Sequence, residues 1–153
     1  MSGRGGNGVR RERLSVLLDT GAVIAHLRGL AGIAELLAGF AQDGLLATSV
    51  VTVVEIWQGA KEREVERTRL FFTGVKVIPL DGALAEASGQ LARALREKGH
   101  TVGLADAIVA ATAQCFDVPV LTTNSKHFEC MSGLRVYDLR EELSQKSRSR
   151  ERG

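Results

Sequence analysis

Polar side chains directly follow three short apolar runs of this chain, and these runs are typical of buried strands. The carboxyl ends of parallel strands meet at one edge of a sheet, where open α/β sheets bind their ligands. Two further acids stand in helical patterns expected near this edge. The side chains that we expect to converge there are Asp19, Thr20, Thr48, Ser49, Glu55, Asp106, Thr122 and Asn124.

Carboxylate and hydroxyl oxygens without a His or Cys cluster suit a hard cation such as Mg²⁺ or Mn²⁺. The three histidines, His26, His100 and His127, are scattered and lack metal-ligand spacing. Carboxylates brought close together repel one another and lose hydration, and a divalent ion relieves both costs. Such an ion can also activate a water and stabilise charge on phosphate oxygens, so the pattern favours phosphodiester chemistry.

Each of these residues also has a purely structural interpretation. Asp19 could cap the helix that follows it, and Asp106 could simply interact with the dipole of its own helix. Thr52 and Glu55 have the spacing of a capping box, which would make Glu55 a helix cap. The polar residues after the 118–121 run could be ordinary loop formers. The residue types alone leave both interpretations open.

Apolar runs alternate with helical patterns along the chain, which predicts a parallel sheet with helices on both faces. Asp81 is expected to cap the long helix that follows it. Val50, Val53, Val54 and Trp57 fall on one helical face, where Trp57 is expected to contact the core or a second copy of the chain. The expected strands are 14–18, 45–47, 75–78, 118–121 and 134–137, and the expected helices are 22–28, 32–42, 50–60, 62–72, 81–98 and 106–116.

The chain has 153 residues, of which 44% are hydrophobic and 25% are charged, enough for a single buried core. Its net charge of +2 conceals a net +3 on 1–13, a net +3 on 144–153 and a net −4 between them. We therefore expect one domain at 14–143 between two flexible basic ends. An acidic body argues against a protein that coats nucleic acid uniformly.

Two cysteines make no disulfide framework, and no apolar run approaches the ~18–20 residues of a membrane helix. Arg10 and Arg11 before an apolar run faintly resemble an export signal, but Asp19 interrupts that run after five residues. We therefore expect a cytoplasmic protein that makes no membrane contact.

Four segments carry the strongest combined pattern of the chain. They are LLDTGAVIAHL at 17–27, TSVVTVVEIWQGA at 48–60, GLADAIVAATA at 103–113 and VLTTNSKHF at 120–128. In this order they resemble a PIN domain, most closely the VapC-type toxins of toxin–antitoxin pairs. The resemblance covers about 14–140 and implies a three-layer α/β/α sandwich with a central, mostly parallel sheet. It also implies an endoribonuclease that depends on Mg²⁺ or Mn²⁺.

The resemblance assigns the metal to three acids, which in this chain are Asp19, Glu55 and Asp106. Thr20 matches a hydroxyl that orients a water or a metal ligand, and the family's second hydroxyl position is Thr122. Many relatives carry a fourth acid where this chain has Asn124. Because an amide brings no charge, we expect one metal ion. Several relatives have Asp where this chain has His127, which leaves a metal role for His127 unsupported.

The resemblance further implies an RNA substrate (tRNA, rRNA or mRNA), an antitoxin that covers the acidic site and a homodimer formed through apolar surface of 22–57. Metal-activated water would attack the phosphate in line and leave a 5′-phosphate and a 3′-hydroxyl. Single-stranded loops are the expected target, because A-form helices hide their base edges. Arg28, Arg93, Lys126 and the two basic ends are the cations expected to hold the RNA backbone.

Two other functions compete with this interpretation. The segment LLDTGA at 17–22 also matches the catalytic signature of retroviral-type aspartic proteases, whose fold is all-β. The helical patterns at 82–98 and 106–116 argue against that fold. The second alternative is a catalytically weak PIN-like binding module, and the neutral Asn124 is its only support.

Overall fold

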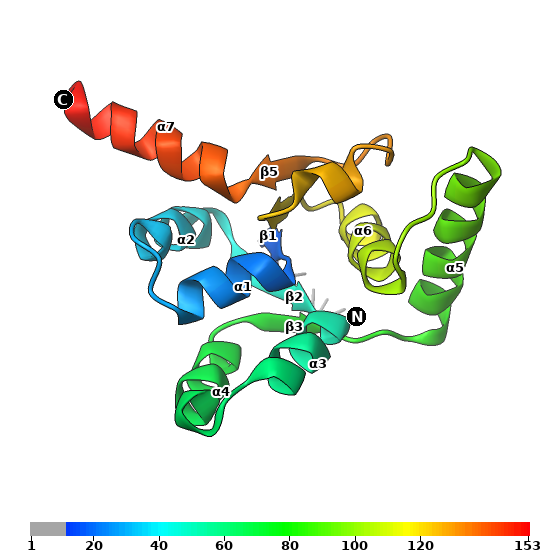
Figure 1. The fold of residues 1–153 in the computed structure, drawn as a ribbon, viewed down its shortest axis with the longest axis horizontal. Coiled ribbons are helices and arrows are strands. Elements are labelled where there is room, and N and C mark those ends of the chain that lie inside the picture. Colours follow the sequence, from blue (N-terminus) through cyan, green and yellow to red (C-terminus); the bar gives the residue numbers. More distant parts are fainter. Residues whose placement is uncertain (1–11) are drawn as a thin grey trace, which may run out of the picture.

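Five parallel strands form the centre of the protein, in the order β3-β2-β1-β4-β5 (Figure 1). The computed structural model describes residues 12–153, so most of the basic segment expected at 1–13 lies outside the described residues. The sheet confirms the predicted parallel α/β architecture. The strands are β1 (Leu14–Leu18), β2 (Leu45–Ser49), β3 (Lys76–Ile78), β4 (Val120–Thr122) and β5 (Val136–Asp138).

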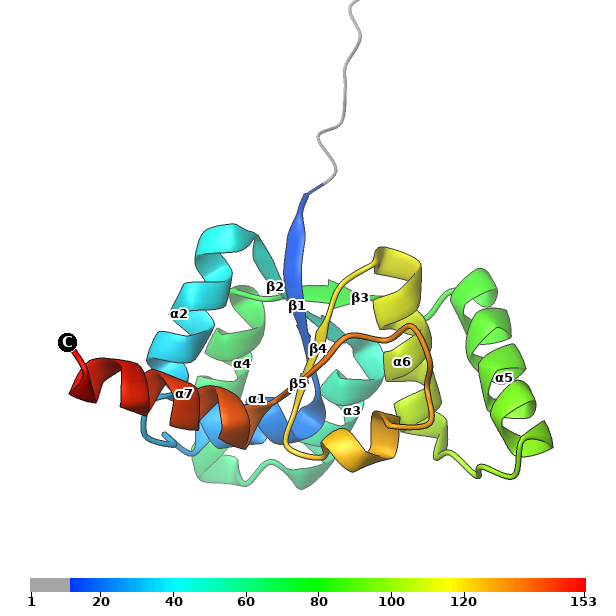
Figure 2. The same cartoon turned by 90° about the horizontal axis from the view of Figure 1, so that it is seen from above.

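Helices cover both faces of this sheet and make three layers (Figure 2). Helices α1, α2, α4 and α7 lie on one side of β1, and α6 lies on the other with α5 outside it. The helices are α1 (Thr20–Leu27), α2 (Ile33–Asp43), α3 (Val50–Gly59), α4 (Val65–Thr73), α5 (Gly82–Glu97), α6 (Leu104–Phe116) and α7 (Leu139–Glu151), with 3₁₀ turns η1 (Glu62–Glu64) and η2 (Ser125–Phe128).

The central strand β1 divides the core into two halves, because successive side chains of a strand point to opposite faces. Leu17 packs into the cluster under α5 and α6. Val16 and Leu18 pack into the cluster under α1, α2 and α7. All three side chains are fully buried, which explains why this strand is a continuous apolar run.

Helix α6 is enclosed by the sheet and by α5. Every residue from 107 to 113 is buried, and four of these seven are alanines, whose small side chains let the neighbouring elements approach closely. The outer helix α5 is capped as predicted, since Asp81 Oδ1 accepts a hydrogen bond of 2.8 Å from the Leu84 N–H.

The capping box predicted for Thr52 and Glu55 is wrong. Helix α3 begins at Val50, and its cap is Ser49, whose Oγ accepts a hydrogen bond of 3.2 Å from the Val51 N–H. Thr52 lies inside the helix and is buried. Strand β2 ends at Ser49, so this hydroxyl caps the helix in place of the predicted Thr52. The Glu55 side chain is therefore free for another role.

The flexible tail expected at 144–153 is also wrong, because residues up to Glu151 continue helix α7. Asp138 caps this helix by accepting hydrogen bonds from the N–H groups of Arg140 and Glu141. Leu139 is buried in the core, and Leu143 packs against the same cluster. The sequence of α7 is mostly polar, so its two core-facing leucines gave no clear helical pattern.

The second half of α7 is held against α2 by charged side chains. Lys146 Nζ donates a hydrogen bond of 3.1 Å to the Glu35 carbonyl oxygen, and Arg150 pairs with the Glu35 carboxylate. Acids in the first turn and arginines in the last turn also complement the helix dipole. The C-terminal positive charge is therefore displayed on a helix.

The observed sheet overturns the aspartic-protease alternative, which requires an all-β fold. The DTG residues lie where a buried parallel strand meets helix α1. Within residues 12–153, no helix has the length and apolar character needed to cross a bilayer.

The environment of His26 disfavours the charged form of its ring. It lies half-buried on α1 with its ring centroid 5.3 Å from that of Phe71. Its Nδ1 is buried and has no hydrogen-bond partner among residues 12–153. Burial consequently lowers the pKa of His26 below its ordinary value of 6.5.

A lowered pKa means that the folded state binds the proton less readily than the unfolded state does, so acid favours unfolding. We expect the melting temperature to fall as the pH drops from about 7.5 to about 5.5. His26→Leu should reduce this fall, and the same substitution at the exposed His100 should not. Thermal melts followed by circular dichroism at several pH values measure the effect, and an identical pH dependence in His26→Leu would contradict it.

Candidate active site

Polar side chains meet at the carboxyl ends of β1, β2 and β4. Buried Thr48 at the end of β2 donates a hydrogen bond of 3.0 Å to the Leu18 carbonyl oxygen. The Asp19 N–H donates to the Leu121 carbonyl oxygen at 3.0 Å, which joins the ends of β1 and β4. These contacts fix the backbone from which the functional side chains project.

Asp19 stands at the N-terminal cap position of α1, but its side chain does not cap that helix. Its Oδ2 instead accepts a hydrogen bond of 2.8 Å from Thr122 Oγ1. Burial raises the pKa of Asp19, the Thr122 hydrogen bond opposes that rise, and the charges of Asp106 and Glu55 add to it. Asp19 is therefore close enough to each of the other two predicted acids to be affected by its charge.

Glu55 projects from α3 toward the start of α1. Thr20 Oγ1 donates a hydrogen bond of 2.8 Å to Glu55 Oε1. This contact spans two helices, whereas a cap would have bonded within one. The Thr20 hydroxyl, which was predicted to orient a water or a metal ligand, thus binds one of the three acids, Glu55.

Asp106 lies in the first turn of α6, two residues after the helix begins at Leu104. Its Oδ2 is 3.0 Å from His127 Nδ1, and a quarter of its side chain is exposed. The sequence placed His127 near the site but gave no signal that it contacts an acid. That contact depends on how η2 folds back over α6.

Asn124 is brought to the site by the turn after β4. Its N–H donates a hydrogen bond of 3.0 Å to Thr122 Oγ1. Its side-chain Nδ2 lies 3.0 Å from His127 Nε2. Every residue predicted for the site thus lies at the same edge of the sheet, and His127 joins them.

Gly21, in the DTG segment, is required for close packing at this edge. A Cβ at this position would lie 2.0 Å from Thr123 Oγ1. Thr123 sits between Thr122 and Asn124, so any side chain at position 21 would push on the turn that carries them. This role is not among those predicted from the sequence, and no local signal reveals it.

The three cations expected at the rim are all exposed. Arg28, at the end of α1, lines a small pocket of about 130 Å³ together with Glu55. Lys126 lies in η2 beside His127. Arg93 lies on the outer helix α5. Arg28 and Lys126 therefore belong to elements that carry site residues, and Arg93 does not.

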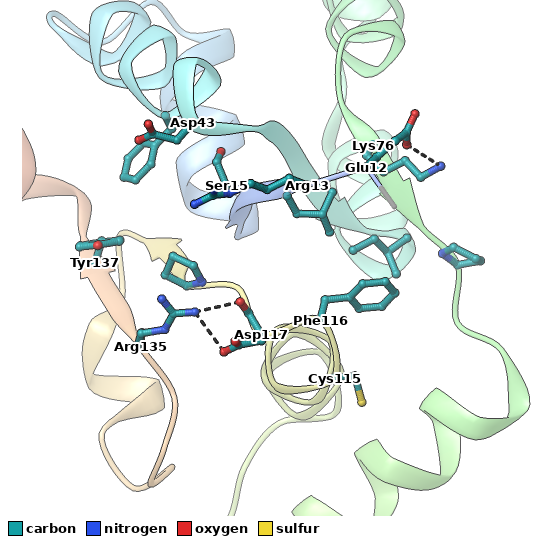
Figure 3. A pocket seen from close by; sticks show the side chains of 15 residues that line it. Glu12, Arg13, Ser15, Asp43, Lys76, Cys115, Phe116, Asp117, Arg135 and Tyr137 are labelled. Atoms are coloured by element: carbon teal, nitrogen blue, oxygen red, sulfur yellow. Dashed lines mark hydrogen bonds and ion pairs between the residues drawn. The ribbon is translucent and has the colours of Figure 1, made fainter. Parts of the chain in front are cut away.

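A wide hollow lies elsewhere, at the amino ends of the strands (Figure 3). It measures about 1160 Å³ and opens among the starts of β1 and β3 and the end of α6. Two of its acids already face cations, as Arg135 pairs with Asp117 at 3.2 Å and Lys76 with Glu12 at 3.6 Å. The chemistry of the carboxyl edge, rather than the size of this hollow, locates the candidate site.

The donor set at the carboxyl edge fits a hard divalent cation. Asp19, Glu55 and Asp106 offer oxygen ligands. A bound cation would neutralise the negative charge by which Asp106 and Glu55 disfavour the ionised form of Asp19. Within residues 12–153, no three or more Asp, Glu, His or Cys side chains are placed so that together they could hold a metal ion. The three acids therefore share one edge of the sheet without closing around a common point.

Residues 16–133 match the family described as the PIN domain. The chain belongs to the PIN-domain family. Ribonuclease VapC10 of Mycobacterium tuberculosis is 32% identical over 120 residues, which are 78% of this chain and 90% of that protein. The predicted family is therefore confirmed.

Solved structures share this PIN fold. DNA-bound VapBC from Salmonella typhimurium superposes with a TM-score of 0.74 at 25% identity, covering 82% of this chain and 98% of that one. A toxin–antitoxin complex from Klebsiella pneumoniae gives a TM-score of 0.68 at 29% identity and covers 82% and 100%. The predicted three-layer fold is confirmed by these similarities.

The environment of Asp19 predicts that its charge destabilises the PIN fold. Asp19→Asn keeps an oxygen to accept from Thr122 and removes the charge that burial and the two acids oppose. We expect its melting temperature at neutral pH to rise by several degrees, since about 1 kcal/mol shifts a domain of this size by roughly 2–4 °C.

Asp117→Asn is the matched control, because the Asp117 side chain is 97% exposed and asparagine tolerates its left-handed backbone. Scanning calorimetry without added metal should find this control close to the wild type. A melting temperature of Asp19→Asn at or below that of the control would show that the Asp19 charge carries no such cost.

Proposed function

We propose that this PIN-domain protein is a Mg²⁺- or Mn²⁺-dependent endoribonuclease and the toxin of a toxin–antitoxin pair. The observation that carries the proposal is the gathering of Asp19 after β1, Glu55 on α3 and Asp106 on α6, where partial burial and the other two acids raise the pKa of Asp19. Relatives named ribonucleases and a similar toxin–antitoxin complex support the same function.

Asp19, Glu55 and Asp106 would hold the ion. The bound ion would supply a water of lowered pKa and would stabilise the charge that develops on the phosphate. Thr20 keeps Glu55 Oε1 in place through its hydroxyl, and Thr122 does the same for Asp19 Oδ2. Asn124 adds no fourth charge to this set, which favours a single ion.

The substrate that this site fits is a single-stranded stretch of tRNA, rRNA or mRNA. An acidic centre repels phosphate, so cations around it must hold the RNA backbone. Arg28 and Lys126 are exposed on elements that carry site residues. Arg148 and Arg152 are exposed near the end of α7 and would attract RNA over a longer range, an effect that salt weakens.

RNA cleavage by the purified protein tests the proposal. We expect cleavage with Mg²⁺ or Mn²⁺ that a chelator abolishes. Asp19→Asn and Glu55→Gln should lower the rate by a factor on the order of 100 or more, since each removes a charge at the reacting centre. Glu62→Gln is the control, because Glu62 is an exposed acid of η1 outside the site.

Cleavage that survives both the chelator and Asp19→Asn would sink the metal-nuclease proposal. If the wild type cleaves none of several RNA classes, the alternative of a catalytically weak PIN-like binding module would be favoured. Growth arrest on expression, lost in Asp19→Asn, tests the toxin role separately. Growth unaffected by the wild type, despite cleavage in vitro, would remove the toxin part of the proposal.

The antitoxin would cover the acidic edge and offer a basic side chain near Asp19 and Asp106, where negative charge is unneutralised. The homodimer would use an apolar face of α3. On that face Val54 is 61% exposed and Val50, Val53 and Trp57 are only half-buried, while Leu104 at the start of α6 is 78% exposed. Apolar side chains exposed together on packed helices mark a surface that a partner covers.

We expect the purified protein to be a dimer and Val54→Asp to make it a monomer, because a charge would have to be buried in the interface. Light scattering after gel filtration measures the mass. Leu70→Asp is the control, as Leu70 is 73% exposed on a different helix, α4. A wild-type monomer, or a dimer broken only by the control, would contradict this interface.

A further inference from the structure

A chain of hydrogen bonds connects two of the three acids through the turn after β4. Asp19 Oδ2 accepts from Thr122 Oγ1, and Thr122 Oγ1 accepts in turn from the Asn124 N–H. The Asn124 side chain contacts His127, and His127 contacts Asp106. Asp19 and Asp106 lie on elements 87 residues apart, at the end of β1 and the start of α6. The turn after β4 connects them, because it carries Thr122, which binds Asp19, and His127, which binds Asp106.

The chemistry of the partners assigns the protons on the His127 ring. The Asp106 carboxylate only accepts hydrogen bonds, so Nδ1, 3.0 Å from Asp106 Oδ2, must donate. Asn124 Nδ2 only donates, and it lies 3.0 Å from Nε2 and 3.4 Å from Nδ1. With the Nδ1 proton directed at Asp106, the Asn124 amide nitrogen lies close to both ring nitrogens and packs against the ring.

We propose that His127 is a positioning residue of the metal site, which orients Asp106 through the Nδ1–H hydrogen bond while Asn124 fixes the ring. This inference rests on the proposed metal-dependent function. The imidazole takes the place that a further acid would fill, and it orders a ligand without adding negative charge. The contact uses only one of the two Asp106 carboxylate oxygens, Oδ2.

Two features of the surroundings support a functional contact over a structural one. His127 is half exposed, with 53% of its side chain accessible, so it contributes little to the core. The next residue, Phe128, is 2% exposed and anchors η2 in the cluster under α6. The turn is therefore held by Phe128, and the ring of His127 is free to serve Asp106. Hydrogen bonds that orient metal ligands are generally worth 10–100-fold in affinity or activity.

Titration calorimetry with Mn²⁺ alone, on the full-length protein, tests the inference without using activity. His127→Leu removes the donor, and we expect Mn²⁺ to bind about tenfold more weakly. His127→Asn places an amide nitrogen where Nδ1 stood and should restore the affinity to within about threefold of the wild type. His100→Leu makes the same substitution at an exposed histidine outside the site, so it is the control and should bind as the wild type does. Melting temperatures verify that each variant is folded.

Affinity unchanged in His127→Leu would overturn the inference. Tighter binding in His127→Leu would also overturn it, because it would show that His127 competes with the ion for Asp106. If His127→Asn binds Mn²⁺ as weakly as His127→Leu does, the hydrogen bond donated to Asp106 is not what supports the affinity. These outcomes are distinct from failure of the proposed function, in which the wild type itself would bind no Mn²⁺ and Asp19→Asn would change nothing.

Discussion

Three carboxylates share one edge of a parallel sheet, and their repulsion is the constraint on which the rest of the site depends. The pKa of Asp19 is raised chiefly by burial and further by the charges of Asp106 and Glu55. A fold tolerates such a cluster only if its elements cannot relax apart. The fully buried strand β1, with core packed on both of its faces, provides that rigidity.

Each acid is also held by a donor from a different element. A hydroxyl on α1 binds Glu55, a hydroxyl at the end of β4 binds Asp19, and an imidazole on η2 binds Asp106. A hydrogen bond from a neighbour fixes the direction of a carboxylate and disperses part of its charge. The site is thus pre-arranged without being closed, and the proposed cation would meet its remaining charge.

Most of the fold follows from local patterns in the chain. The apolar runs of β1 and β4 and the cap of α5 at Asp81 depend on neighbours in sequence, and these predictions are confirmed. The predicted cap of α3 was wrong because Ser49 and Thr52 are equally suited to cap a helix by residue type. Only the point where β2 ends selects Ser49. The tail predicted at 144–153 is a helix because its contacts are long-range: Leu143 packs on the core, and Lys146 and Arg150 contact Glu35 on α2, more than a hundred residues away.

The sequence by itself determined the parallel α/β architecture, the family and the acids that belong together, because strand ends, helix starts and residue types are local properties. Only the tertiary structure decided which donor serves which acid. It paired Thr20 with Glu55, placed His127 against Asp106 and made Gly21 necessary beside Thr123. These contacts join segments that are far apart in the chain, so they depend on how helices and turns pack at the sheet edge, which no local pattern encodes.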